Sequence, residues 1–272
     1  MTSSRLAVWG DPIAHSKSPA LHAAAYAVLG LPWEYGRMQV SADAFPDALC
    51  ALDDSWRGLS LTMPLKEVAF RAAATHDRHA ALTGAVNTLL LGAESAGFNT
   101  DVGGIVDALA EGGVSEVRRV RILGGGATAA SALVAAAEIG AQTADVRARR
   151  PQRASGLVAL GEEIGVHVTI APFDVAPEPV DLTLATLPSG TVLEAAVVEL
   201  LAAAGGVLFD AAYAPWPSAL GTVWGDAPVI SGLGMLLHQA VRQIRIFHDG
   251  DPAVPLPDEA AVIAAMRGAL FA

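Results

Sequence analysis

A strand, a glycine turn and a helix follow one another between residues 119 and 139, and this order constrains the fold more than any other feature. The sequence RIL at 121–123 runs directly into GGGATA at 124–129, and an alanine-rich stretch follows. These letters fit G-x-G-x-x-G/A, with Ala129 in the third small position. Glycine permits the tight turn and lets backbone N–H groups approach a pyrophosphate at a helix N-terminus. The segment therefore predicts a βαβ unit that binds a dinucleotide, with a plain βα turn as the alternative.

Short apolar runs alternate with helical stretches along the rest of the chain, which predicts an α/β fold with parallel units. We expect strands over residues 5–10, 35–40, 58–62, 85–91, 96–99, 120–123, 143–147, 166–170, 180–185 and 207–210. We expect helices over residues 19–29, 42–52, 102–110, 127–139, 152–164, 191–204, 235–247 and 258–270. Ser18 is the expected N-cap of the first helix, with Pro19 at its first position, and Asp101 is the expected cap of the third.

Bulk composition excludes several classes of protein. The chain has 272 residues, of which 53% are hydrophobic, so it can form one large or two ordinary domains with sizeable cores. Its net charge of −11 argues against a nucleic-acid partner, because a phosphate backbone repels an acidic surface. Cys50 is the single cysteine, so we expect no intrachain disulfide and no metal site. No secretory signal or apolar run of membrane length is recognisable, so we expect a soluble cytoplasmic protein without a membrane partner.

The strand after the glycine turn carries two signals about the cofactor. Asp145 lies at about the spacing at which NAD enzymes place a carboxylate for the ribose 2′-hydroxyl, yet it precedes the end of the strand. The strand end is followed by ARRPQR, which contains Arg149, Arg150 and Arg153. Three arginines at the start of a helix oppose the helix dipole, and a bound phosphate would relieve that cost. The pattern favours NADP over NAD. The alternative is that these arginines bind no ligand and lie in solvent at the start of a helix.

Polar residues in the first half of the chain gather at predicted strand ends. Ser16 and Ser18 flank a lysine after the first strand, and Thr62, Lys66, Asn87 and Asp101 lie at or just after later ones. Each residue taken singly can be an ordinary cap or surface residue. Ligands of open α/β sheets bind at the carboxyl ends of the strands, however, so the shared placement predicts a site for a small oxygen-rich acid. Lys66 and Asp101 are the expected acid–base pair for reducing a ketone or oxidising an alcohol.

Through these motifs and others, the chain resembles the shikimate dehydrogenase family over essentially its whole length. The resemblance lies in GDPIAHSKSP at 10–19, TMPLK at 62–66, GFNTD at 97–101, ARRPQR at 148–153 and GLGMLLHQA at 232–240. It implies an NADP enzyme that interconverts 3-dehydroshikimate and shikimate on the route to aromatic amino acids. It also implies a substrate domain over 1–100 plus 235–272, an inserted Rossmann-like NADP domain over 101–234, and an active cleft between the two domains.

The resemblance also implies roles for particular residues. Ser16 and Ser18 would hold the substrate carboxylate, and Lys66 would carry the proton. The substrate hydroxyls would contact Thr62, Asn87, Asp101 and Gln239, with Tyr213 nearby. NADP would contact Gly124, Gly125, Gly126, Ala127, Thr128, Ala148, Arg149, Arg150, Arg153, Ala211 and Gly232.

Three positions depart from the family pattern, and two other readings stay open. Ser60 and Leu184 stand where the family usually has asparagine, and ARR at 148–150 replaces the usual NRT. A quinate/shikimate dehydrogenase that uses NAD is the near alternative, and Asp145 is the residue that allows it. A non-catalytic metabolite sensor on the same fold is the distant alternative, and it would need neither Lys66 nor Asp101. The sequence leaves the oligomeric state as monomer or homodimer.

Overall fold

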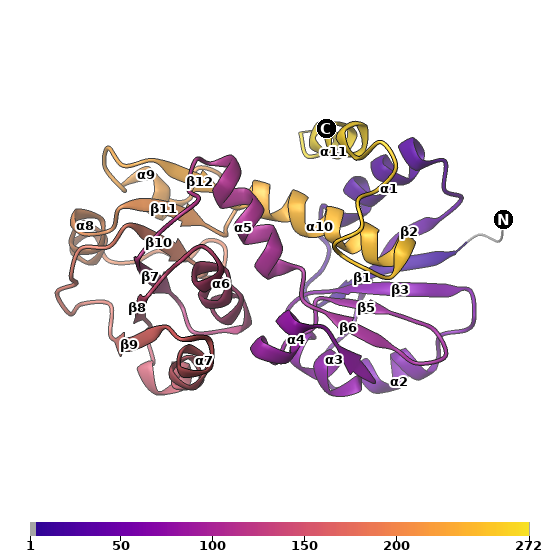
Figure 1. Ribbon diagram of the computed structural model, residues 1–272, viewed down its shortest axis with the longest axis horizontal. Helices are drawn as coiled ribbons and strands as arrows, with labels where there is room; N and C mark the ends of the chain where they lie inside the picture. Colours follow the sequence, from indigo (N-terminus) through magenta and orange to yellow (C-terminus); the bar gives the residue numbers. More distant parts are fainter. Residues whose placement is uncertain (1–3, 272) are drawn as a thin grey trace. The chain divides into compact units, whose positions relative to one another are not determined.

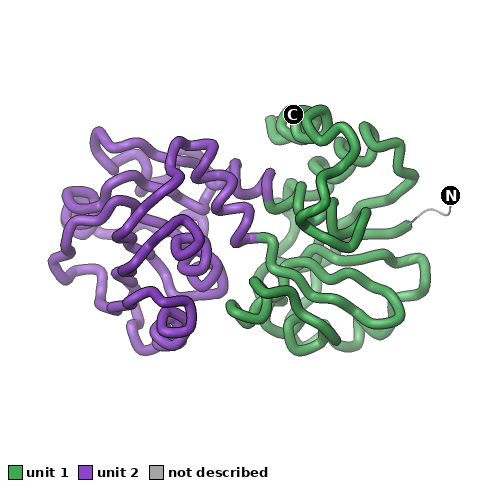
Figure 2. The backbone as a smooth tube through the Cα atoms, in the orientation of Figure 1, with its two compact units in different colours: residues 1–100, 239–272 green, residues 101–238 purple. Residues whose placement is uncertain are grey.

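The computed structural model describes residues 4–271, and the chain divides into two compact units (Figure 2). Unit 1 contains residues 1–100 together with 239–272, and unit 2 contains residues 101–238. The long helix α10 (Gly232–Asp249) runs across the second boundary, so the chain returns to unit 1 inside a helix. Within residues 4–271 no helix is both long enough and apolar enough to cross a membrane.

Unit 1 is built on a mixed sheet with the strand order β2-β1-β3-β5-β6-β4 (Figure 1). The strands are β1 (Arg5–Gly10), β2 (Glu34–Gln39), β3 (Trp56–Leu61), β4 (Thr75–His76), β5 (Thr88–Leu90) and β6 (Ala96–Phe98). Strand β1 pairs in parallel with β2 and β3, whereas β5 runs antiparallel to both β3 and β6. The expected strands around the turn after residue 91 are therefore a hairpin inside an otherwise parallel arrangement.

Helices of unit 1 complete its core. They are α1 (Ser18–Leu29), α2 (Phe45–Cys50), α3 (Lys66–Ala72), α4 (Arg78–Thr83), the second part of α10, and α11 (Glu259–Ala269). Trp9 of β1 is fully buried and meets the ring of Phe45 edge-on, with 6.0 Å between ring centroids. Leu59, Leu65 and Leu89 are buried in the same cluster, so the apolar face of the sheet packs under α2 and α3.

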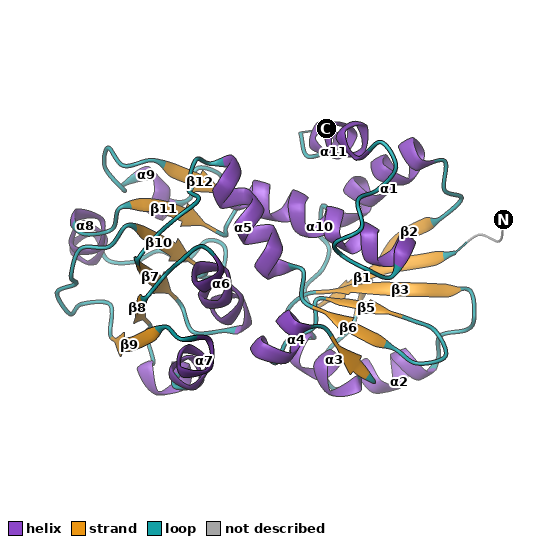
Figure 3. Ribbon diagram, in the orientation of Figure 1, coloured by secondary structure: helices purple, strands orange, loops and turns teal. Residues whose placement is uncertain are grey.

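Unit 2 contains a parallel sheet with the order β12-β11-β10-β7-β8-β9, which is the doubly wound order of dinucleotide-binding domains. The strands are β7 (Arg119–Leu123), β8 (Thr143–Arg147), β9 (His167–Ala171), β10 (Leu182–Ala185), β11 (Val207–Asp210) and β12 (Val229–Ser231). Helices α5 (Asp101–Glu111), α6 (Ala127–Glu138), α7 (Gly156–Ile164), α8 (Ala195–Ala203) and α9 (Ala219–Thr222) accompany them (Figure 3). The strand order reverses between β7 and β10, and ligands of such sheets bind at that point.

The α/β fold class is confirmed, whereas several expected helix starts and elements are wrong. Ser18 is the first residue of α1, and the N-cap is Lys17, which makes no side-chain cap bond; Pro19 is therefore the second helical residue. Asp101 is likewise the first residue of α5 and not the residue before it. The expected helix over 152–164 is a 3₁₀ turn over Pro151–Ala154 followed by α7. The short elements α3, α4, α9, β4 and β12 were not expected, because a few residues carry too little periodicity.

Candidate functional site

The carboxyl ends of β1 and β3 are held side by side in unit 1. Thr62 N–H donates to the Trp9 carbonyl at 3.0 Å, and Asp11 N–H donates to the Met63 carbonyl at 2.9 Å. A side chain at Gly10 would collide with the Thr62 methyl group and would lie 3.0 Å from the Met63 carbonyl. Glycine is therefore required where these two loops cross, and the close approach brings the segments that begin at residues 10 and 62 to one edge of the sheet.

Ser16 and Ser18 lie in the connection from β1 to α1. The Ser16 hydroxyl oxygen accepts a hydrogen bond from Ser18 N–H at 3.3 Å, and Ser18 itself is buried. The Lys17 amine turns to the C-terminal end of α11, where it donates to the Leu270 carbonyl at 2.8 Å. The structure therefore separates the lysine from the two serines by giving it a carbonyl partner on another helix.

Lys66 and Asn87 are brought together through the backbone. Lys66 is the first residue of α3, and its carbonyl accepts a hydrogen bond from Val86 N–H at 2.9 Å. Asn87 follows directly and precedes β5. Because the two backbones are joined at this point, the lysine and the asparagine project from neighbouring positions at the sheet edge.

Asn87 is fixed by a buried set of hydrogen bonds to Thr100. Its side-chain oxygen accepts from Thr100 N–H at 2.9 Å and from the Thr88 hydroxyl at 2.8 Å, and its amide nitrogen donates to the Thr100 hydroxyl at 2.9 Å. Asp101 comes next in the chain, and only 4% of it is exposed. Thr100 thus fixes the Asn87 amide, and the Asp101 carboxylate belongs to the residue directly after Thr100. Gln239, on α10, is also buried in unit 1.

Sequence reasoning missed a second buried polar set behind these residues. The Tyr35 hydroxyl donates to the Ser60 hydroxyl at 2.6 Å, and Ser60 donates to Gln243 Oε1 at 2.7 Å. Gln243 Nε2 in turn donates to the Asn87 carbonyl at 3.2 Å. The departure of Ser60 from the family pattern was the only sequence signal for this set, because its members lie far apart in the chain.

The glycine turn of unit 2 fits a pyrophosphate. Gly124 has φ +121°, and a side chain there would lie 2.5 Å from the Thr186 hydroxyl oxygen. A side chain at Gly125 would lie 2.8 Å from Cβ of Ala154, so the turn packs against the arginine-containing segment. At Gly126, the N-cap of α6, nothing lies within 4 Å of an added Cβ. Backbone N–H groups at the start of a twelve-residue helix therefore border open space, which suits an anionic group.

The arginines after β8 project into solvent next to that turn. Arg149, Arg150 and Arg153 are exposed, whereas Ala148 and Ala154 are buried beneath them. Within residues 4–271 none of the three forms an ion pair. The helix α7 begins only at Gly156, and Arg153 lies in the 3₁₀ turn before it. The expected repulsion between these arginines and the dipole of a long helix is therefore smaller than the sequence predicted. Three exposed cations beside a glycine turn, with no carboxylate partner among the described residues, fit a phosphate-bearing ligand.

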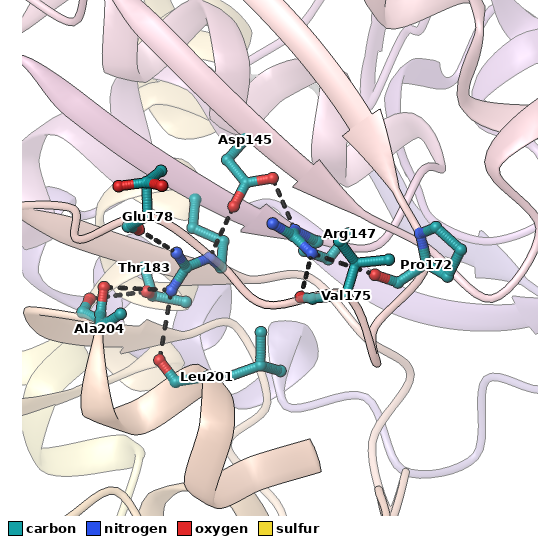
Figure 4. Close-up of polar contacts among 10 residues, drawn as sticks. Asp145, Arg147, Pro172, Val175, Glu178, Thr183, Leu201 and Ala204 are labelled. Carbon is teal, nitrogen blue, oxygen red and sulfur yellow. Dashed lines mark hydrogen bonds and ion pairs between the residues drawn. The ribbon is translucent and has the colours of Figure 1, made fainter.

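Asp145 lies in the middle of β8, before the carboxyl end of the strand, and its side chain is engaged by two arginines (Figure 4). Its two oxygens accept from Arg121 Nε at 3.0 Å and from Arg147 Nε at 2.6 Å. Arg121 also donates to the carbonyls of Leu201, Ala204 and Glu178, and Arg147 donates to those of Pro172 and Val175. The Asp145 carboxylate therefore pairs with two buried guanidinium groups, and both of these also donate to carbonyls of residues 172–178.

The remaining predicted cofactor contacts lie after β11 and β12. Ala211 N–H donates to the Ala185 carbonyl at 2.9 Å, and the Ala211 backbone passes so close to Gly232 that a side chain at Gly232 would collide with it. Tyr213 follows in the same loop, and burial raises the pKa of its hydroxyl. Thr186, which covers Gly124 and donates to the Leu123 carbonyl at 2.9 Å, was missed. Leu184 is fully buried in β10, so its side chain belongs to the core and not to the turn.

Comparisons with known proteins identify relatives of this chain. Residues 8–89 match the family model described as the shikimate dehydrogenase substrate binding domain. The chain is 35% identical to the shikimate dehydrogenase (NADP(+)) of Bordetella petrii, covering 98% of this chain and 96% of that protein, and 36% identical to that of Thermus thermophilus, covering 98% of each.

Solved structures give the same result. The shikimate dehydrogenase of Mycobacterium tuberculosis superposes with a TM-score of 0.82 at 36% identity, covering 97% of this chain and 99% of that one. The shikimate 5-dehydrogenase of Thermus thermophilus in complex with NADP(H) and shikimate superposes with a TM-score of 0.79 at 32% identity, covering 98% and 99%. With identity above 30% across nearly the full length, this chain belongs to the shikimate dehydrogenase family.

Proposed function

We propose that this protein is an NADP-dependent shikimate dehydrogenase that reversibly reduces 3-dehydroshikimate to shikimate. The observation that carries the proposal is the relation to NADP-dependent shikimate dehydrogenases over 98% of the chain, with the polar set of unit 1 and the glycine turn of unit 2 both present. Unit 1 would bind the substrate and unit 2 the cofactor.

The residues of unit 1 offer the hydrogen bonds that a hydroxylated acid needs. Hydroxyls from Ser16 and Ser18 would hold the carboxylate. The amide of Asn87, fixed by Thr100, would bind a ring hydroxyl together with Thr62 and Gln239, and with Asp101, which directly follows Thr100 and is the first residue of unit 2. Ser18, Asn87 and Gln239 are buried, and Asn87 is already held by Thr100, so this part of the set would bind its ligand without first having to be ordered.

Lys66 would move the proton. NADPH, when bound, supplies the hydride for the carbonyl carbon. The carbonyl oxygen gains negative charge as the hydride arrives, and the Lys66 ammonium would donate a proton to it; in the reverse direction the amine would take the proton from the alcohol. Asp101 would hold the lysine in place and bind the same hydroxyl. A sensor protein would need neither group, and this supports catalysis over sensing.

The structure supports NADP over NAD. Arg149, Arg150 and Arg153 offer guanidinium groups that bind phosphate in a bidentate manner, and the glycine turn packs directly against their segment. Asp145, the residue that had left NAD open, has both oxygens engaged by Arg121 and Arg147. Because Asp145 is engaged in this way, the quinate enzyme that uses NAD is the weaker candidate.

Location and assembly are part of the same proposal. We infer a cytoplasmic enzyme that acts as a monomer or a homodimer, without a membrane or nucleic-acid partner. Fractionation, and light scattering of the purified protein, test these two points.

Initial rates with shikimate and with quinate, each measured with NADP and with NAD, test the function. We expect kcat/KM to be highest for shikimate with NADP, and lower by at least about tenfold when NAD replaces NADP, the scale of one lost charge-assisted contact. Equal or higher kcat/KM with quinate and NAD would favour the alternative. The absence of turnover with all four pairs, together with measurable shikimate binding, would favour a sensor.

A further inference from the structure

Unit 1 contains a line of hydrogen bonds, half-buried at one end and buried at the other, that the proposed mechanism does not use. It consists of Tyr35, Ser60 and Gln243 and is called the relay here. Ser60 and Gln243 are 3% and 2% exposed, so neither can exchange its partners for water. Gln243 lies one turn after Gln239 on α10, so both side chains share one face of that helix.

The donors and acceptors of the relay fit in one direction only. The Tyr35 hydroxyl donates to Ser60, and the single Ser60 hydrogen then goes to Gln243 Oε1. This assigns the oxygen end of the Gln243 amide, so its nitrogen faces the Asn87 carbonyl. That carbonyl also accepts from Leu61 N–H at 2.7 Å, so both of its lone pairs are used. Removing any one group would leave a buried donor or acceptor unsatisfied.

Each end of the relay adjoins a residue proposed to bind substrate. At one end Gln243 fixes the carbonyl of Asn87, whose side chain is oriented by Thr100. At the other end the Tyr35 hydroxyl lies within hydrogen-bonding reach of Ser18. The Tyr35 ring is stacked on His22, with 3.8 Å between centroids and 18° between planes, so its hydroxyl cannot swing away.

We propose that Gln243 is a positioning residue that, through Ser60 and Tyr35 on one side and the Asn87 carbonyl on the other, sets the spacing between Ser18 and Asn87 for the substrate. This inference rests on the proposed function. If Gln243 only satisfied buried hydrogen-bonding groups, its substitution would lower stability and leave the affinity for substrate unchanged. If it positions Ser18 and Asn87, its substitution would also weaken substrate binding.

Gln243→Leu tests the proposal, because it keeps the volume and removes both hydrogen bonds. We expect KM for shikimate, and its Kd measured by calorimetry without cofactor, to rise roughly 5- to 20-fold, the scale of one misaligned hydrogen bond to a charged or buried group. KM for NADP should stay within about twofold, because the glycine turn and the arginines lie in the other unit. Tyr35→Phe, which removes one oxygen and keeps the ring, should cause the same selective rise.

A double variant and a matched control separate positioning from stability. Gln243→Leu combined with Tyr35→Phe should raise KM by much less than the product of the single effects, because both break one line of contacts. Ile244→Val is the control, since this neighbouring side chain is fully buried on the same helix and carries no polar atom. It should lower the melting temperature and leave KM for shikimate unchanged.

Two results would overturn the inference. An unchanged KM and Kd for shikimate in Gln243→Leu and in Tyr35→Phe, with an active wild type, would show that the relay serves the core alone. Independent multiplicative effects in the double variant would show that the two residues do not act as one line. A wild-type protein that neither binds nor oxidises shikimate would overturn the proposed function, and this inference with it.

Discussion

Single side chains decide the chemistry at the edge of the first sheet. Lys17 and Lys66 are the two lysines of the chain, and their settings differ. Lys17 donates to a helix-end carbonyl, whereas Lys66 begins α3 beside the Asn87 segment. The Lys17 ammonium therefore serves the fold, whereas the Lys66 ammonium is the one that we propose for proton transfer.

Lys66→Ala should lower kcat by a factor of about 10² to 10⁴, the usual contribution of a positioned acid–base group. KM for shikimate should change much less, because other residues bind the substrate. Steady-state rates measure both constants. Lys17→Ala is the matched control: it should cost some stability and leave kcat unchanged. An unchanged kcat for Lys66→Ala would remove this residue from the mechanism.

At the scale of elements, the arginine of β8 and the arginines of the segment that joins β8 to α7 differ in burial. Arg147 ends the strand and is buried against Asp145, whereas the arginines of residues 149–153 are exposed. Alternate side chains of a strand point to opposite faces, so Asp145 and Arg147 share a face and meet Arg121 from the neighbouring strand.

Removing Arg149 or Arg153 should weaken NADP binding and leave NAD binding nearly unchanged, because only NADP carries the 2′-phosphate. Each lost charge-assisted contact is worth roughly 1.5–3 kcal/mol, which is about 10- to 100-fold in Kd. Titration of each variant with both cofactors measures this. Arg118→Ala is the control, since this exposed arginine directly precedes β7. Equal losses for NAD and NADP would show that these arginines only steady the fold.

Asp145→Asn should cost stability and leave the preference for NADP unchanged. Breaking the pair leaves Arg121, which is fully buried, without its carboxylate, and such a loss costs about 3 kcal/mol or more. Chemical denaturation measures the free energy of unfolding, and the ratio of kcat/KM for the two cofactors measures the preference. Asp174→Asn, on the exposed segment nearby, should change neither. A shift of that ratio in Asp145→Asn would mean that Asp145 contributes to cofactor recognition.

At the scale of the whole molecule, stability depends on a fully buried histidine in the core of unit 1. His22 accepts or donates through Nδ1 with the Tyr26 hydroxyl at 2.9 Å and stacks on Tyr35. Burial lowers the pKa of His22 from 6.5 to about 3. The folded protein therefore holds this ring neutral under conditions in which the unfolded chain protonates it.

The free energy of unfolding should fall as the pH drops from 6.5 toward 3. The pKa of His22 is lower in the folded state, so its contribution is fully present above pH 6.5 and is lost below it, by about 1.4 kcal/mol per pH unit. Denaturation at several pH values measures this slope. His22→Phe should flatten it, whereas His167→Gln, an exposed histidine on β9, should leave it unchanged. Equal slopes for wild type and His22→Phe would contradict the assignment.

The local sequence determined the α/β class, the strand–glycine–helix unit and the polar set at the strand ends. Each of these depends on a few consecutive residues. Glycine is needed where φ is +121° at Gly124, and the hydroxyl residues Ser16 and Thr62 follow β1 and β3. Asn87 instead precedes β5 and lies at the same edge because β5 runs antiparallel to β3. Helix starts were placed less well, because Ser18 and Asp101 can cap a helix or begin it, and the surrounding packing decides.

Only the tertiary structure decided how those residues are bonded. Asp145 could have held a ribose, and its engagement with Arg121 follows from the pairing of β7 with β8. Ser60 meets Gln243 across 183 residues of sequence, and Lys17 meets Leu270 across 253. A buried polar group must be paired, and its partner is whichever group the packing of distant elements brings within 3 Å. That choice depends on how the sheets and helices pack, which no local pattern encodes.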